Sequence, residues 1–302
     1  MNRYSIYIIL IVCWACKEPG EIIIVPDNPS PPYSGITELS LNNYINRAYI
    51  DLIGREPLDS ELERDANFLR NRQTTETALD TFLLMLQTDT TYIAGDSSYR
   101  HAYCWQLYAQ AKARMIEGES EEGMYFDILQ LEQKYLKDSL LGNEIGMSFA
   151  LSEIEKLRAI IEAPQAYRKG LIDLSELFKR MLLNEIYDEI NMGTFNFVHA
   201  SFDDLFFRFP TEAEFEAGFE VVEYNKSRII MGESCQNKQE YAEILVHSRE
   251  FHEASIRAAF ISLLGREANT EEILELMPTL ILEQDYAQMQ RFIMKMPEYA
   301  SF

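Results

Sequence analysis

The stretch that decides the fold reads INRAYIDLIGREP over residues 45–57. Its apolar side chains recur every three or four residues, which places them on one face of a helix. Gly54 follows the last of them, where helices commonly end in the left-handed conformation that glycine adopts without strain. The stretch therefore predicts an amphipathic helix that stops at a tight turn. The predicted apolar face consists of Ile45, Ala48, Tyr49, Leu52 and Ile53.

The same pattern occurs twice more along the chain. Residues 256–268 read IRAAFISLLGREA, and residues 198–210 read the more degenerate VHASFDDLFFRFP. Phe207 stands where the other copies have glycine, so the turn of the middle copy is expected to differ. Repetition of this kind predicts a unit of two to three helices that is used three times. The matching apolar faces are Ile256, Ala259, Phe260, Leu263 and Leu264, and Val198, Ser201, Phe202, Leu205 and Phe206.

A second helix is predicted after each turn. Thr211 with Glu214, and Asn269 with Glu272, have the spacing of capping boxes, in which side chains satisfy free backbone N–H groups. In the first copy Leu58 replaces the capping residue although Glu61 keeps its place, and Asp59 is the expected substitute cap. Each copy is then expected to close with an aliphatic residue six positions before an aromatic one. These pairs are Leu86 and Tyr92, Leu245 and Phe251, and Ile293 and Tyr299, with Asp89 and Ser248 as caps in the first two.

An arginine follows the turn of every copy, at Arg55, Arg208 and Arg266. A guanidinium group offers a planar pair of donors that matches a carboxylate, so these side chains are candidates for binding a partner. Alternatively, each hydrogen-bonds carbonyl groups at the end of its own helix. The second, structural interpretation is the favoured one.

Residues 96–194 do not follow the repeat. They predict one or two long helices over residues 151–192 with a kink or break near Pro164, because proline cannot donate a backbone hydrogen bond. Residues 140–143 predict an earlier helix end. This region also contains a cluster of aromatic residues that could line a ligand groove, although packing between helices is the favoured alternative. The cluster consists of Tyr99, Tyr103, Trp105 and Tyr108.

The N-terminal segment has the features of a secretory signal. Arg3 precedes an apolar run over residues 4–15 that is too short to cross a bilayer. Cys13 and Cys16 have the spacing of a redox pair, but no pattern of alternating strands and helices surrounds them. Cys16 follows a small residue, and the segment resembles the lipobox of Bacteroidetes lipoproteins. The resemblance implies a lipid on Cys16, anchorage in the cell envelope, an outer-membrane location and display at the surface.

The net charge of −22 argues against nucleic-acid partners, because an acidic surface repels phosphate groups. The sequence is compatible with two alternatives for Cys104 and Cys235, which are a disulfide between them or two separate buried thiols. His252 and Glu253 begin like a zinc-binding helix, but Ile256 stands where the second histidine is required. The sequence therefore predicts no metal, no cofactor and no catalytic residue.

These features together predict an all-α protein. Its body combines three degenerate helix–turn–helix repeats with a central region of long helices. The predicted segments are a signal peptide (1–15), a proline-rich tether (16–38), repeat 1 (39–95), the central region (96–194), repeat 2 (195–254) and repeat 3 (255–302).

Two further resemblances concern the repeats. Residues 46–57 resemble the opening of a domain of unknown function found in planctomycete cytochrome-associated proteins. Residues 258–266, together with Pro297, Glu298 and Tyr299, resemble a bacterial helical repeat that is related in pattern to phycobilisome linker domains. The resemblances cover less than half of the chain. They imply a helical interaction module, because linker domains act by docking to other proteins.

The favoured functional hypothesis is a non-enzymatic envelope lipoprotein whose repeats bind another protein or a surface polymer. One alternative is an envelope hydrolase that uses carboxylates of the central region around Tyr99 and Tyr108. Another is an accessory partner of envelope redox proteins, which rests on the planctomycete resemblance alone.

Overall fold

The computed structural model describes residues 35–92 and 97–302. The predicted signal segment, Cys16 and nearly all of the predicted tether lie outside these ranges. The chain divides at residues 37 and 38, and the body consists of residues Glu38–Phe302. Among the described residues, no helix combines the length and apolar character needed to span a membrane.

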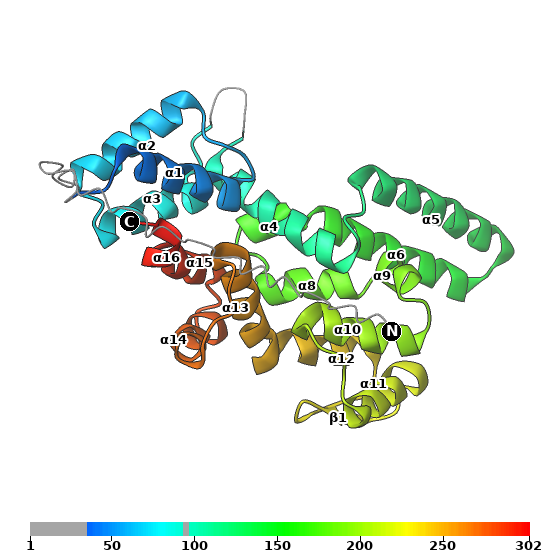
Figure 1. Cartoon of the computed structure of the whole chain (residues 1–302). Coiled ribbons are helices and arrows are strands. Elements are labelled where there is room, and N and C mark those ends of the chain that lie inside the picture. Colours follow the sequence, from blue (N-terminus) through cyan, green and yellow to red (C-terminus); the bar gives the residue numbers. More distant parts are fainter. Residues whose placement is uncertain (1–34, 93–96) are drawn as a thin grey trace, which may run out of the picture. The chain divides into compact units, whose positions relative to one another are not determined.

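The prediction of an all-α protein is confirmed. Within the described residues the body contains sixteen helices and one two-stranded hairpin (Figure 1). The first copy forms α1 (Glu38–Ile53), α2 (Asp59–Asn71) and α3 (Glu76–Thr88). The second forms α10 (Thr194–Phe206), α11 (Glu212–Tyr224), β1 (Arg228–Ile230), β2 (Glu233–Cys235) and α12 (Lys238–His247). The third forms α13 (Arg249–Leu264), α14 (Thr270–Ile281), α15 (Tyr286–Met294) and α16 (Pro297–Ala300).

The central region lies between the first and second copies in sequence. Gly142 ends α5 at a φ of +68°, and Asn143 caps α6 with its side chain, as the sequence predicted for a helix end here. α6 stops at Ile161, and the next helix begins at Ala163 with Pro164 in its first turn, which confirms the predicted break. Beyond the break the prediction of a long helix is wrong, because Asp173 and Asn184 each cap a new helix and three short helices of six, nine and six residues form. The region comprises α4 (Tyr99–Met115), α5 (Glu121–Leu141), α6 (Glu144–Ile161), α7 (Ala163–Arg168), α8 (Leu174–Leu182) and α9 (Glu185–Ile190).

Two hydrophobic cores hold the body together. The first copy and the third copy share one core, with Tyr49 and Phe260 both buried in it. The second copy shares the other core with the central region, around Phe202 and Tyr187. Figure 1 shows α1–α3 beside α15 and α16, although these segments lie at opposite ends of the body's sequence. Helices α4 and α13 each contribute side chains to both cores and so connect them.

Helix α13 belongs to two copies at once. Ser248 caps it through a hydrogen bond from the N–H of Phe251, and Phe251 closes the second copy in the buried core. The same helix then carries the apolar face that opens the third copy. The predicted boundary between residues 254 and 255 therefore lies inside a continuous helix.

The turn of the middle copy is the same as the others, and the expectation that it would differ is wrong. Phe207 adopts a left-handed φ of +59°, close to the +79° of Gly54 and the +71° of Gly265. The N–H of Phe207 bonds the carbonyl of Asp203, as that of Gly265 bonds the carbonyl of Ile261. The guanidinium of Arg114 lies 3.6 Å from the centre of the Phe207 ring. This contact stabilises a side chain at a position that otherwise favours glycine.

The shared turn predicts the same preference for glycine over alanine at residues 207 and 265. At Gly265 an added Cβ would meet no atom within 4 Å, so Gly265→Ala changes only the backbone preference and should cost about 1 kcal/mol. At residue 207, Phe207→Gly should be more stable than Phe207→Ala by a similar amount, since both lose the aromatic ring. Urea denaturation of the three variants measures these differences. Equal stability of Phe207→Gly and Phe207→Ala would contradict the left-handed turn.

The predicted close of the first copy is wrong. Phe251 and Tyr299 are buried, but Tyr92 is 73% exposed and Asp89 ends α3 instead of capping the next helix. The reason is an additional segment after α3, since the next helix begins only at Tyr99 with Ser98 as its cap. The expected cap at Asp59 is also absent. Leu58 precedes α2 and its N–H bonds the Glu61 carboxylate, so only half of a capping box is present.

Candidate functional site

The three recurrent arginines each bind a glutamate of their own copy. The pairs are Arg55–Glu61, Arg208–Glu214 and Arg266–Glu272, and each pair is called here an Arg–Glu clasp. In every clasp two guanidinium nitrogens reach the two carboxylate oxygens over 2.7 to 3.0 Å. The Nη1 group also donates to the carbonyl of the residue after the arginine. The same glutamate accepts the N–H of the residue that precedes the second helix.

An aromatic ring completes each clasp. The guanidinium lies 5.0 to 5.7 Å from the centre of the ring six residues earlier, which is tyrosine in the first copy and phenylalanine in the other two. Each clasp thus links the first helix, the turn and the second helix of a copy. The donors of the three arginines are used within the copies, so the geometry favours the structural interpretation over a partner-binding one.

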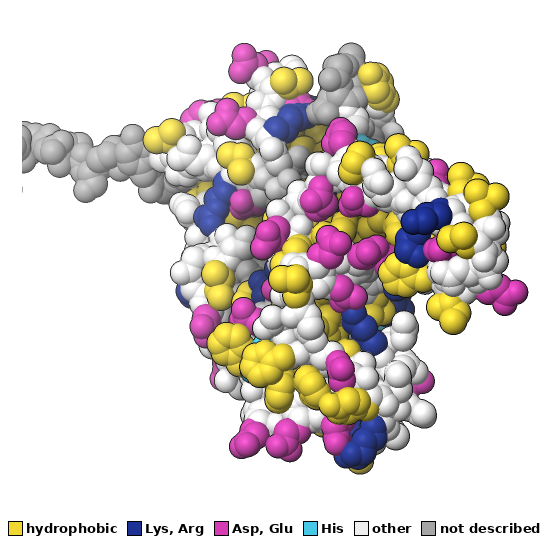
Figure 2. All heavy atoms as spheres, turned by 90° about the vertical axis from the view of Figure 1, so that its right-hand side faces the viewer, with side chains coloured by type: hydrophobic (Ala, Val, Ile, Leu, Met, Phe, Trp, Pro, Cys, Tyr) yellow, Lys and Arg dark blue, Asp and Glu magenta, His cyan; other side chains and the backbone are white. Residues whose placement is uncertain are grey.

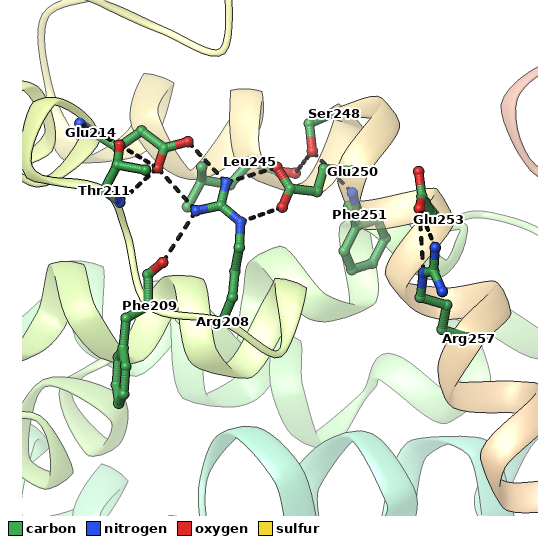
Figure 3. Close-up of polar contacts among 10 residues, drawn as sticks. All are labelled: Arg208, Phe209, Thr211, Glu214, Leu245, Ser248, Glu250, Phe251, Glu253 and Arg257. Carbon is green, nitrogen blue, oxygen red and sulfur yellow. Dashed lines mark hydrogen bonds and ion pairs between the residues drawn. The ribbon is translucent and has the colours of Figure 1, made fainter. Parts of the chain in front are cut away.

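A third group joins each clasp to a later helix. Figure 3 shows Arg208 between Glu214 and Glu250, with Nη2 of Arg208 2.9 Å from Oε2 of Glu250 at the start of α13. Arg266 makes the equivalent contact with Glu298 in α16. In the first copy the hydroxyl of Tyr99, at the start of α4, donates to Glu61 over 2.7 Å. The clasps therefore position a later helix in each case, which is α4 for the first copy, α13 for the second and α16 for the third.

The environments of the clasp glutamates lower their pKa values. Burial works to raise the pKa of Glu61, but hydrogen bonds from Arg55 and Tyr99 outweigh it and bring the pKa to about 2. The hydrogen bond from Arg208 is the largest influence on Glu214 and lowers its pKa to about 2 as well. The bond from Arg266 lowers the pKa of Glu272. All three glutamates are thus ionised near neutral pH.

The predicted aromatic cluster mostly packs between helices. Tyr99, Tyr103 and Tyr108 are buried, and Trp105 is 41% exposed. The Tyr99 hydroxyl lies in a hydrogen-bonded group with Tyr49 and Arg64, and Tyr103 donates to the buried Gln290 over 2.7 Å. None of the four residues lines the main cavity described next.

A cavity of about 330 Å³, called here the main cavity for its apolar walls, lies where α1, α4, α8, α10, α13 and α15 meet. A larger but more polar hollow of about 710 Å³ lies beside Lys179 and Glu243. The walls of the main cavity are largely apolar, and its polar groups include the carboxylates of Asp51 and Asp204 and the guanidinium of Arg114. Ligand pockets commonly have this character: about 300–1,000 Å³ of mainly apolar space with a few placed polar groups. Sequence reasoning did not identify this site. The apolar wall includes Leu107, Ala111, Leu205, Phe251 and Leu263.

The three copies contribute the same position to this cavity. Asp51, Asp204 and Ser262 each stand six residues after the start of the repeated stretch, and all three line the cavity. The hydroxyl of Tyr299 donates to Asp51 and that of Tyr187 to Asp204, both over 2.7 Å. Burial raises the pKa of Asp51 and of Asp204. Alignment of the copies reveals these equivalent positions, but only the fold brings them together.

The structure contains no metal-binding group within the described ranges, where no three histidine, cysteine or acidic side chains gather suitably. Cys104 and Cys235 are both free and buried, and they belong to different cores. Burial raises the pKa of Cys104 to about 11, so this thiol stays protonated near neutral pH. Of a disulfide and two separate thiols, the structure therefore contains the two separate thiols.

Comparison with known proteins gives no relatives. No family model, no curated protein and no solved structure matches the chain.

Proposed function

We propose that this chain is a lipid-anchored protein of the bacterial envelope that binds a helix of another protein through the outer face of α5. The lipid on Cys16 is part of the proposal and lies outside the described residues. The observation that carries the binding role is an unpartnered apolar stripe on α5. No catalytic step is part of the proposal.

Helix α5 has two apolar faces. One packs against α6, which among the described elements is the only one in extensive contact with α5, and buries Met124, Ile128 and Leu131. The other faces away from the body and is called here the outer stripe. Figure 1 shows α5 and α6 extending from the body, and Figure 2 shows apolar side chains gathered on this projecting hairpin. The outer stripe consists of Phe126, Leu129, Leu136 and Leu140, which are 49% to 90% exposed, with exposed Gln133 between them.

The spacing of the outer stripe favours a helical partner. Its five positions follow one another by three, four, three and four residues, which is the spacing of the contact seam in a coiled coil. A single polar residue in such a seam fixes the register of the partner helix, and Gln133 takes that place. Contiguous exposed apolar surface of this kind is typical of interaction sites.

The charges around the stripe indicate which helix fits. Acidic side chains dominate its first half, with Glu121, Glu122 and Asp127 near Phe126. Lys134 and Lys137 flank its second half, so the basic residues of the partner belong beside Phe126. A second copy of the chain, at a net charge of −22, would be repelled, and so would an anionic lipid surface. The complementary partner is an amphipathic helix with basic residues beside its apolar face. A surface polymer fits less well, because most of the stripe is aliphatic and offers few rings for stacking on sugars.

The two other hypotheses have less support. A hydrolase that uses the region around Tyr99 and Tyr108 would need a cleft there, and those tyrosines are packed side chains. The carboxylates of the main cavity, Asp51 and Asp204, already accept tyrosine hydroxyls. No observation in the described part of the structure specifically supports a role as a partner of redox proteins.

Charge substitution in the stripe tests the proposal. We expect Leu136→Glu to weaken recovery of the partner from solubilised native envelope by about thirtyfold, as for a central contact worth about 2 kcal/mol. Leu282→Glu is the matched control, because Leu282 is 79% exposed and lies after α14, outside the hairpin. Quantitative mass spectrometry of tagged, lipidated protein gives the readout. Equal recovery with both variants would rule out the stripe as the binding surface.

A further inference from the structure

Independently of the outer stripe, we infer that the main cavity binds a small molecule with an apolar body and a cationic group, and that Asp204 anchors the cation. None of the outer-stripe residues lines this cavity. The inference and the proposed function therefore rest on different residues and are tested separately.

Small side chains leave the space open. Ala258 lines the cavity from α13, and the equivalent position of the first copy carries Arg47. There the longer side chain reaches across to the carbonyls of Leu263 and Tyr299. Ala111 of α4 lines the same space from the other side. A volume of about 330 Å³ between such walls suits a small ligand, not only water.

The charges of the lining favour a cation. Asp51 and Asp204 supply two carboxylates, against one guanidinium from Arg114. Arg114 is already engaged, since it donates to the carbonyls of Asp203 and Asp204 and stacks on the Phe207 ring. An anion would therefore meet two carboxylates and no available guanidinium donor pair.

Asp204 is the better anchor of the two carboxylates. Nε of Arg47 lies 3.8 Å from Oδ2 of Asp51 and partly compensates its charge. The Asp204 carboxylate has one hydrogen bond, from the Tyr187 hydroxyl to Oδ2, while Arg114 binds its backbone. Arg114 also acts on the half-buried Asp204 carboxylate through its charge, but burial outweighs this influence and raises the pKa, so a cationic ligand would stabilise the ionised form.

Three probes with one apolar body test the inference: 4-phenylbutylammonium, 4-phenylbutanol and 4-phenylbutanoate. Each is titrated into the full chain, and binding is followed by calorimetry and by saturation-transfer NMR. We expect the ammonium to bind at least tenfold more tightly than the alcohol, and the carboxylate to bind most weakly. Equal affinity for the ammonium and the carboxylate would overturn the inference.

Two variants separate the cation site from the apolar space. Asp204→Asn can still accept the Tyr187 hydroxyl, and it should remove the preference for the ammonium over the alcohol. Ala258→Leu should weaken binding of all three probes by narrowing the cavity. Ala113→Leu, on the exposed side of α4, is the matched control and should bind like the parent protein. Undiminished binding to Ala258→Leu would show that the probes bind elsewhere and would also overturn the inference.

Discussion

Glu61→Ala is expected to lower the free energy of unfolding by about 3 kcal/mol, because it leaves buried partners without their acceptor. The Glu61 side chain is 5% exposed and accepts bonds from Arg55, from the Tyr99 hydroxyl and from the N–H of Leu58. Truncation removes the acceptor from all three donors at once. Urea denaturation followed by circular dichroism measures the loss.

The third copy supplies the matched control for this prediction. Glu272 makes the same clasp with Arg266, but its side chain is 15% exposed and no tyrosine donates to it, so Glu272→Ala should cost about half as much. The stabilisation of Glu61 should depend on pH. Its pKa falls from 4.5 to about 2 on folding, so the advantage over Glu61→Gln is complete above pH 4.5 and lost as the pH falls to about 2. Equal costs at Glu61 and Glu272 would contradict the buried clasp.

Phe202→Ala and Phe260→Ala are each expected to cost about 3–5 kcal/mol, as for a large aromatic removed from a closed core. The two residues occupy the same position of the repeat, and both are fully buried. They belong to different cores, since Phe202 packs with the central region and Phe260 packs with the first copy. The two substitutions should therefore loosen different helices.

Hydrogen–deuterium exchange with mass spectrometry resolves this difference. Phe260→Ala should speed exchange in α1–α3 and α14–α16, whereas Phe202→Ala should speed it in α8 and α10–α12. The effect in α1–α3 is the informative part, because these helices are about two hundred positions from residue 260 in the sequence. Faster exchange confined to α13 and α14 in Phe260→Ala would contradict a core shared by the first and third copies.

The sequence predicted the local structure of the repeats well. Apolar spacing located the faces of α1, α10 and α13, and the cap residues located the starts of α11 and α14. The arginines and the capping glutamates were each recognised, yet not as pairs. Their constant separation of six residues in all three copies was the available signal. At Phe207 the sequence was misleading. The absence of glycine suggested a different turn, but the turn matches those at Gly54 and Gly265, and the contact with Arg114 stabilises it.

What the sequence could not supply depends on contacts between distant segments. Nothing in residues 45–57 indicates that they pack against residues 256–264, since the same apolar pattern fits any neighbouring helix. The cavity has the same origin, because Asp51 and Asp204 meet only after the copies have packed. The β1–β2 hairpin was missed although Met231 and Gly232 form a two-residue turn with positive φ angles. The Tyr92 error arose because an inserted segment shifted the start of α4.

The most direct test of the central proposal is site-specific photocrosslinking in the native envelope. A photoreactive amino acid is placed at residue 136, in the outer stripe, and in a control protein at residue 155, on an exposed position of α6 in the same hairpin. We expect a discrete protein adduct from position 136, its loss when Leu129→Glu is added, and little adduct from position 155. Equal yields from both positions, or protein recovered without an adduct from position 136, would contradict binding through the outer face of α5.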